Sequence, residues 1–345
     1  MRKKSLNVRR KVLKQIQFFC NKPKILKIYK EFKKNIPENK TSFIAGISGG
    51  PDSMALAFFL KCYSLEKNVK IRYTHIDHCL RKNSSKEASL VKKKLLSIGI
   101  KLNIIKWIGK KPQSNIQSIA RKNRYKLLLN STKSTQKKTL FFAHTQNDLI
   151  ENFFLRIMRG SGLEGITSFN SNFVNNKKYN ICRPLLKVKK TDLLDVSNKV
   201  FNFFIQDPSN DDIIFKRTRI RHIINQIIDE GFDFTKLQLT LKNLTYSNKT
   251  IKYYVGENLK KNVKILNDKR LAILSNNFFE QPQDIMFRSL NIILSELNQK
   301  YYNARGKSLT RAINELKNNN LKKLTISGCI IENLQNIVII YPENQ

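Results

Sequence analysis

The sequence predicts a parallel α/β domain followed by a smaller α+β domain. From about residue 41, short apolar, β-rich runs alternate with helix-like segments, as a parallel sheet with crossover helices requires. After about residue 230 this alternation stops, and long helical patterns are followed by β-like runs. With 345 residues the chain is long enough for two hydrophobic cores. We therefore expect a basic N-terminal extension (1–40), an α/β domain (41–230) and a smaller C-terminal domain (231–345).

The individual elements follow from the periodicity of the apolar residues. Strands are expected at residues 43–47, 71–76, 102–107 and 140–143, and helices at 52–66, 86–98, 115–130, 148–158, 189–203 and 220–230. Residues 167–180 are Asn-rich and aperiodic and are expected to form a loop. The C-terminal part is expected to contain helices at 234–261 and 284–298, then β-like runs at 324–332 and 337–341. Because ligands of open parallel sheets bind beyond the carboxyl ends of the strands, the residues that follow the first, second and fourth strands are candidates for a site.

The first expected strand runs directly into the segment SGGPDS, residues 48–53. Its glycines let the backbone approach a ligand closely, and their N–H groups add to the positive end of the following helix in holding an anion. Pro51 suits a first helical turn, and Asp52 and Ser53 in that turn can cap amides or hold a phosphate-bound Mg²⁺. The segment matches neither a Walker loop nor a dinucleotide-binding turn. It predicts a phosphate site of another kind, with an ordinary strand–turn–helix corner without a ligand as the open alternative.

Basic residues greatly outnumber acidic ones. Lys and Arg number 65 against 25 Asp and Glu, a formal net charge of +40. Such an excess indicates a polyanionic partner, either nucleic acid or an acidic membrane surface. We favour nucleic acid, because drift in composition does not explain why acidic residues are so few. The first 20 residues are basic and free of acid, which fits an organellar transit peptide or, as we favour, an extension that contacts RNA.

The cysteines and the apolar runs predict a cytoplasmic protein. Five cysteines are scattered without a CxxC pair or a metal-ligand spacing to the four histidines. This pattern argues for a reducing compartment and against a zinc or iron–sulfur site. No apolar run reaches the ~18 residues needed to cross a bilayer, and no secretory signal is recognisable. We therefore expect a cytoplasmic location and no membrane partner.

Six sequence blocks, in order, resemble one enzyme family. The segment SGGPDS resembles the pyrophosphate loop (PP-loop) of the N-type ATP pyrophosphatases. The blocks HIDHCLR (75–81), NIQSIARKNRY (115–125), AHTQNDLIENFFLRIMRGSGLEGI (143–166), RPLL (183–186) and DPSNDDIIFKRTRIR (207–221) resemble the tRNA(Ile)-lysidine synthetases. This resemblance implies a parallel-sheet PP-loop ATPase fold, similar to the adenine nucleotide α-hydrolases.

The resemblance also implies a reaction and its partners. The family is a group of ligases that use ATP, with Mg²⁺, to adenylate C2 of the wobble cytidine in the CAU anticodon of tRNA(Ile) and release pyrophosphate. Free L-lysine then displaces AMP and leaves lysidine. A tRNA-binding role for residues 231–345 and a homodimer are compatible with the resemblance.

One helix carries the candidate lysine site. At helical spacing the segment 148–159 places its apolar residues on one half and Asp148, Glu151, Arg156 and Arg159 on the other. A solvated surface helix is the plain alternative. However, the helix begins directly after a strand end, beside the expected ATP, where two carboxylates can hold the amino groups of a lysine substrate. Asp148 and Glu151 also fall on the acidic lysine-site positions of the family.

The expected site therefore combines residues of several kinds. The residues expected to bind ATP are Ser48, Gly49, Gly50, Pro51, Asp52, Ser53, His75, Asp77 and His144, and Asp52 is also expected to contact Mg²⁺. Those expected to bind lysine are Arg124, Asp148 and Glu151, those expected to be catalytic are Asp52, Asp148, Glu151 and Arg217, and those expected to bind tRNA are Arg156, Arg159, Arg219 and Arg221. His75, Asp77 and His78 are expected to shape the ATP pocket rather than to bind zinc.

Several positions depart from the family pattern. Asn147 stands where an aspartate is usual, Leu149 where a glutamine is usual, Asn152 where a threonine is usual, Cys79 where a glycine is usual and Thr218 where an asparagine is usual. The missing acid at position 147 removes a charge that could contact Mg²⁺ or substrate, so we expect weakened rather than abolished activity. The alternatives are another PP-loop tRNA-modifying enzyme and a degenerate, catalytically weak tRNA-binding protein.

Overall fold

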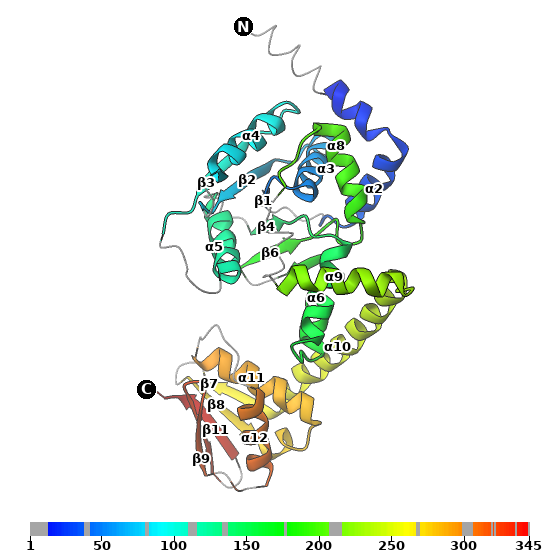
Figure 1. Cartoon of the computed structure of the whole chain (residues 1–345). Coiled ribbons are helices and arrows are strands. Elements are labelled where there is room, and N and C mark those ends of the chain that lie inside the picture. Colours follow the sequence, from blue (N-terminus) through cyan, green and yellow to red (C-terminus); the bar gives the residue numbers. More distant parts are fainter. Residues whose placement is uncertain are drawn as a thin grey trace. The chain divides into compact units, whose positions relative to one another are not determined.

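The chain forms two compact units, which are residues Met1–Phe234 and Thr235–Gln345 (Figure 1). The computed structural model describes residues 13–37, 42–79, 83–109, 116–132, 137–175, 178–206, 216–266, 270–298, 306–318, 320, 322–334 and 337–343. Among these residues no helix is long and apolar enough to cross a bilayer.

The first unit is built on a mostly parallel six-stranded sheet. Its strands are β1 (Ser42–Gly46), β2 (Ile71–Asp77), β3 (Leu102–Lys106), β4 (Lys138–Phe141), β5 (Phe173–Asn175) and β6 (Tyr179–Cys182). Its helices are a first helical segment at 13–20 and α2 (Pro23–Lys34), α3 (Pro51–Lys67), α4 (Ser84–Leu96), α5 (Ile116–Asn130), α6 (Gln146–Ile157), α7 (Leu163–Thr167), α8 (Lys190–Phe201) and α9 (Lys216–Asp229). The spatial order β3-β2-β1-β4-β6-β5 confirms the predicted α/β class and reverses direction between β1 and β4.

Both faces of this sheet are covered, as a parallel sheet requires. Alternate residues of β1 enter different cores: Phe43 and Ala45 pack with α2, α3, α4 and α8, whereas Ile44 packs with α5 on the other face (Figure 1). Helix α3 is apolar on nearly all sides, because it lies between the sheet and the neighbouring helices. This arrangement holds the start of α3 rigidly at the carboxyl end of β1.

The N-terminal segment contributes to the core of the first unit. Helix α2, which lies in the stretch expected to be a basic extension, buries Ile25 and Phe32. The ring of Phe32 lies 5.5 Å from that of Phe59 in α3. RNA contact is expected for the first 20 residues. Of these, residues 1–12 lie outside the described part of the chain, and the helical segment at 13–20 buries Ile16 in this core.

The loop expected at 167–180 was a wrong prediction. Strand β6 lies parallel to β4, with Leu140 opposite Ile181, and β5 pairs with it in the antiparallel direction. A buried Asn180, whose side chain donates to Thr139 Oγ1 at 3.3 Å, replaces an apolar residue in the alternation. The amide nitrogen is paired with a neighbouring strand, while Oδ1 is buried without a hydrogen-bond partner among the described residues. A buried polar residue at this position means that the strand gave no apolar signal.

The second unit combines three helices with an antiparallel sheet. Its elements are α10 (Phe234–Asn262), β7 (Val263–Leu266), β8 (Leu271–Ser275), a short 3₁₀ helix (Asn276–Phe278), α11 (Gln283–Asn298), α12 (Gly306–Lys317), β9 (Lys323–Ile326), β10 (Cys329–Asn333) and β11 (Ile337–Pro342). The strand order is β7-β8-β11-β10-β9. Helices α11 and α12 bury Leu290 and Leu309 in the same core as Leu274 of β8.

The β-like run expected at 324–332 is a hairpin rather than one strand. Ser327 and Gly328 have φ of +54° and +74°, which is the left-handed pair of a tight two-residue turn. Strands β9 and β10 pair on either side of that turn, with Cys329 opposite Ile326. The Ser-Gly pair was the available signal for this break.

Candidate active site

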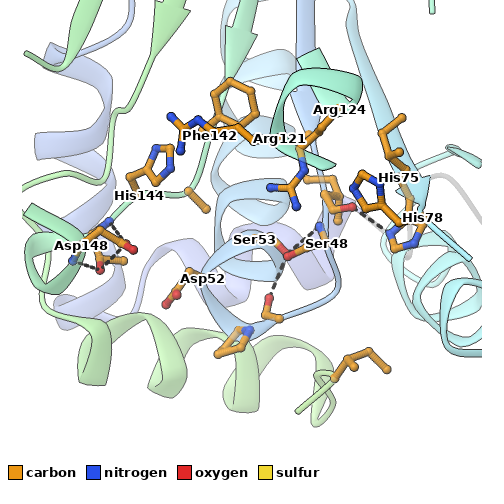
Figure 2. Close-up of a pocket in the computed structure, with 18 of the residues that line it drawn as sticks. Ser48, Asp52, Ser53, His75, His78, Arg121, Arg124, Phe142, His144 and Asp148 are labelled. Carbon is orange, nitrogen blue, oxygen red and sulfur yellow. Dashed lines mark hydrogen bonds between the residues drawn. The ribbon is translucent and has the colours of Figure 1, made fainter. Parts of the chain in front are cut away.

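A cavity of about 480 Å³ opens beyond the carboxyl ends of β1, β2 and β4. Strand β1 lies between β2 and β4, so the strand order reverses here, which is where ligands of open α/β sheets bind. The walls come from residues 46–53, 74–79 and 142–148, and from α5, which contributes Arg121 and Arg124. Figure 2 shows these arginines and Asp52 directed into the same space.

The side chain of Ser53 holds the loop between β1 and α3 in shape. Its Oγ accepts hydrogen bonds from the N–H groups of Ser48 at 3.2 Å and Gly49 at 3.0 Å, and donates to the carbonyl of Gly50 at 2.9 Å (Figure 2). The hydroxyl is therefore engaged within the loop. We interpret Ser53 as the residue that fixes the path of the backbone around the cavity.

Gly49 occupies a position that only glycine fits. Its φ is +94°, a left-handed conformation that side chains disfavour. A Cβ added there would lie 2.6 Å from Val91 Cγ2 and 3.1 Å from Ile205 Cγ1. The N–H of Ile205 donates to the Gly49 carbonyl at 2.9 Å, so the segment after α8 packs against this loop and holds it in place. By contrast, a Cβ on Gly50 would meet no protein atom closer than 3.8 Å.

Helix α3 presents an uncapped N-terminus to the cavity. Its N-cap residue Gly50 has no side chain, and Pro51 opens the first turn without needing a hydrogen-bond partner. Unsatisfied N–H groups and the helix dipole favour an anion at such an end. Helix α6 differs, because Thr145 and Asp148 form a capping box at its start. Of these two helices, α3 is therefore the one whose N-terminus can bind a phosphate.

The surroundings of the Asp52 carboxyl disfavour its ionised form. Burial, and next the charge of Asp148, raise the pKa of Asp52 to about 7, while Lys190 and Arg221 oppose the rise. Its Oδ1 is buried and has no hydrogen-bond partner among the described residues. Carboxylate oxygens are preferred ligands of Mg²⁺, so an unpartnered oxygen here fits a cation that is also bound by phosphate oxygens. Within the described chain no three or more His, Cys, Asp or Glu side chains are arranged to hold a metal without such help.

The two acids of α6 have different partners. Asp148 Oδ2 accepts from the Thr145 backbone N–H at 2.8 Å and from Thr145 Oγ1 at 2.9 Å (Figure 2). The Glu151 carboxylate accepts from Arg221 Nε at 2.6 Å and from Arg221 Nη2 at 3.4 Å, and Glu151 is buried. Helix α9 packs beside α6 and so delivers Arg221 to the cavity. Arg221, expected to bind tRNA, therefore lies in the pocket as the partner of an expected lysine ligand.

Three histidines around the cavity are neutral at physiological pH. Burial lowers the pKa of His144 to about 3 and that of His78 to about 4, and it lowers the pKa of His75 as well. His75 Nδ1 lies 2.9 Å from the Ile47 carbonyl, which only accepts, so Nδ1 carries the proton. The ring of His144 makes an edge contact with Phe169, with centroids 5.0 Å apart. These neutral rings offer stacking surfaces and single hydrogen bonds to a nucleotide base.

Most of the expected site residues line this one cavity. They are Ser48, Gly50, Pro51, Asp52, Ser53, His75, Asp77, Arg124, His144, Asp148, Glu151 and Arg221. Gly49 lies in the same loop without lining the cavity, and Arg156, Arg159 and Arg219 lie outside the lining. The side chain of Arg217 lies outside the described residues.

Some lining residues were missed from the sequence. Lys190 begins α8, Glu87 and Ser84 belong to α4, and Ile205 follows α8. No motif or periodicity pointed to them, since they reach the cavity only through packing of distant elements. For Lys190 the only signal was its place a few residues after the RPLL block.

Two departures from the family pattern have structural consequences. Cys79, in place of a glycine, has φ of +52°, so it holds the left-handed conformation that glycine adopts without strain. Asn147, in place of an aspartate, accepts a hydrogen bond from the Lys190 N–H at 3.4 Å. An amide oxygen therefore still ties α6 to the start of α8, but without the negative charge.

Comparison with known proteins gives consistent results. A family model described as a PP-loop domain matches residues 21–228. The tRNA(Ile)-lysidine synthase of Orientia tsutsugamushi is 31% identical over 319 residues, covering 89% of this chain and 70% of that protein. The enzyme of the same name from Wolbachia pipientis wMel is 29% identical over 300 residues (85% and 69%). That from Bradyrhizobium diazoefficiens is 31% identical over 212 residues (61% and 58%), so the chain spans 58–70% of the length of these relatives.

Among solved structures, the U34-tRNA thiolase from Methanococcus maripaludis has a similar fold. The TM-score is 0.52 at 14% sequence identity, and the match covers 64% of this chain and 78% of that protein. At this identity the similarity supports the α/β fold alone.

Proposed function

Because this chain belongs to the tRNA(Ile)-lysidine synthase family of PP-loop enzymes, we propose that it joins lysine to C2 of the wobble cytidine in a CAU anticodon. The family membership makes it an ATP-dependent tRNA-modifying ligase. The reaction proposed here has two steps, adenylation of the cytidine and displacement of AMP by lysine. The observation that carries the proposal is one cavity in which the uncapped start of α3 faces the acids of α6.

In the first step the start of α3 and residues 48–53 bind the phosphates of ATP. The cytidine O2 attacks the α-phosphorus, the bond from that phosphorus to the bridging oxygen breaks, and pyrophosphate leaves with the electron pair. Asp52 is the residue that would hold Mg²⁺, which neutralises charge on the phosphate oxygens when it is bound. The strained, unpartnered carboxyl of Asp52 supports this role, since a cation would relieve its burial.

In the second step Asp148 and Glu151 hold the amino groups of lysine, and Arg124 binds its carboxylate. An arginine suits that task because its planar guanidinium pairs with a carboxylate through two hydrogen bonds. The ion pair with Arg221 holds the Glu151 carboxylate in place at the cavity. The lysine amine then attacks C2 as the neutral base, and AMP leaves with the electron pair of the C2–O bond. Arg217 is proposed to assist on the phosphate side.

RNA binding is proposed for basic surfaces outside the cavity. Arg156, Arg159 and Arg219 lie on α6, at its end, and on α9, which flank the site. In the second unit α10 exposes Tyr246 and Tyr253, seven residues apart on one helical face. The ring of Tyr246 lies 5.7 Å from Lys242 Nζ and 5.9 Å from Lys249 Nζ, a combination of charge and aromatic surface that suits phosphates and unpaired bases.

The proposed setting is the cytoplasm. All five cysteines are free, which fits a reducing compartment. Free lysine and tRNA are the other proposed partners.

Mass spectrometry of nucleosides tests the function directly. A CAU-anticodon tRNA(Ile) is incubated with the protein, ATP, Mg²⁺ and lysine, with ATP or lysine omitted as controls. We expect a lysine-sized mass addition on cytidine that needs both. The Asp52→Ala variant is expected to lose modification while it still binds tRNA. Unmodified tRNA that binds tightly to the wild type would instead favour a degenerate tRNA-binding protein.

A further inference from the structure

The first residue of α8 lines the same cavity as the loop at residues 48–53. Lys190 lines the cavity, whereas its neighbour Lys189, the N-cap residue of α8, is exposed and does not. Helix α8 packs along α3, and Ser197 Oγ donates to the Pro51 carbonyl at 2.6 Å. The backbone N–H of Lys190 is held by Asn147 Oδ1. The start of α8 is therefore tied to α6, and the middle of α8 to the first residue of α3.

Only α3 offers a free helix end to this cavity, because its N-cap residue Gly50 has no capping side chain. The first N–H of α8 is already held by Asn147 Oδ1. Lys190 therefore contributes to the cavity through its side chain, as a cation in the same cavity as the start of α3.

The charge of Lys190 is available to a ligand. Arg221, the other cation that acts on Asp52, is bound by the Glu151 carboxylate at 2.6 Å. Among the described residues the Lys190 ammonium makes no ion pair or hydrogen bond, although its charge acts on Asp52 strongly enough to oppose the rise in the Asp52 pKa. An aspartate at position 147 would place a negative charge beside this lysine, and the neutral Asn147 does not.

We propose that Lys190 is a catalytic residue that contacts the β- and γ-phosphates of ATP and neutralises the pyrophosphate as it leaves. This rests on the proposed function, because it assigns the leaving-group side of the adenylation step. As the bond between the α-phosphorus and the bridging oxygen breaks, negative charge grows on the β-phosphate, and a lysine placed there stabilises the transition state. The ammonium keeps its proton throughout, and pyrophosphate carries away the electron pair.

Nucleotide binding separates this role from a structural one. Isothermal titration calorimetry compares ATP with AMP for the wild type, Lys190→Met, Lys190→Arg and Lys189→Met. A lost charged contact weakens binding by about 10- to 100-fold, so Lys190→Met should lose that much affinity for ATP and keep its affinity for AMP. Lys190→Arg should restore most of the ATP affinity, and the control Lys189→Met should match the wild type. Equal loss of ATP and AMP affinity in Lys190→Met, or no loss, would overturn the proposal.

The half-reactions give an independent readout. Lys190→Met should slow pyrophosphate release in the presence of tRNA but transfer lysine at the wild-type rate onto tRNA that already carries the adenylated cytidine. A variant that is slow in both half-reactions would contradict a role confined to the leaving group. Failure of the wild type to form lysidine would refute the proposed function, while the contrast between ATP and AMP binding would still test Lys190.

Discussion

Replacing Asp52 by asparagine should stabilise the ligand-free protein while it abolishes modification. The Asp52 carboxyl is buried beside Asp148 and Oδ1 has no partner among the described residues, so its ionised form is destabilised in the folded state. Asparagine has nearly the same shape and no charge. The substitution therefore removes a strain that the site holds for its ligand.

The size of the effect follows from the pKa. A folded-state pKa of about 7 against the ordinary aspartate pKa of 3.8 corresponds to about 4 kcal/mol of unfavourable free energy once the group is ionised. Water in the open cavity lessens the strain, so we expect Asp52→Asn to gain ~2 kcal/mol at pH 8. A raised pKa means that the wild type loses stability as the pH rises from about 4 to about 7. The two proteins should therefore be equally stable near pH 4 and differ most above pH 7.

Urea unfolding at several pH values, followed by tryptophan fluorescence, measures this difference. The chain has one tryptophan, Trp107, which directly follows β3, so the signal reports on the first unit. Adding ATP and Mg²⁺ should stabilise the wild type more than the variant, because only the wild type offers the carboxylate to a cation.

Asp77→Asn is the matched control with the opposite sign. Burial opposes ionisation of Asp77, but hydrogen bonds from the Cys79 N–H at 2.9 Å and Ser85 Oγ at 2.8 Å hold its pKa below the ordinary value. This variant should lose about 1–2 kcal/mol at pH 7, and the loss should shrink as the pH falls through the depressed pKa. A less stable Asp52→Asn protein at pH 8, or a gain that is independent of pH, would refute the reasoning.

Three further results are expected. Gly49→Ala should cost about 2–4 kcal/mol, since it combines a left-handed φ with a 2.6 Å approach to a side chain, whereas Gly50→Ala should stay within about 1 kcal/mol in the same urea assay. Glu151→Gln and Arg221→Gln should each cost about 1–3 kcal/mol, and a double-mutant cycle that shows no coupling between them would contradict the ion pair. Affinity for tRNA, measured by filter binding, should fall at least ~10-fold between 50 and 200 mM salt, because the basic residues behind the +40 net charge contact phosphates. An affinity that does not change with salt would show that these residues do not contact the phosphates.

The α/β framework could be predicted from the sequence because its signals are local. Apolar runs mark β1, β2 and β4, and the Gly-Gly turn with Pro51 marks the start of α3. Strand β6 could not be predicted in this way, because its buried Asn180 is stabilised by Thr139 of another strand. The break between β9 and β10 depended on two residues with positive φ.

The sequence by itself determined the turn at residues 48–53 that starts α3, the acids of α6 and the family. Residues 48–53 are contiguous, so backbone conformation and helix capping within a few residues decide their geometry. Only the tertiary structure decided that Ile205 donates a hydrogen bond to Gly49, that Arg221 pairs with Glu151 and that Lys190 lines the cavity. Glu151 and Arg221 are 70 positions apart in the sequence, and Gly49 and Ile205 are farther apart still. No short-range pattern encodes such distances, because they arise when packed helices bring separate strand ends to one edge of the sheet.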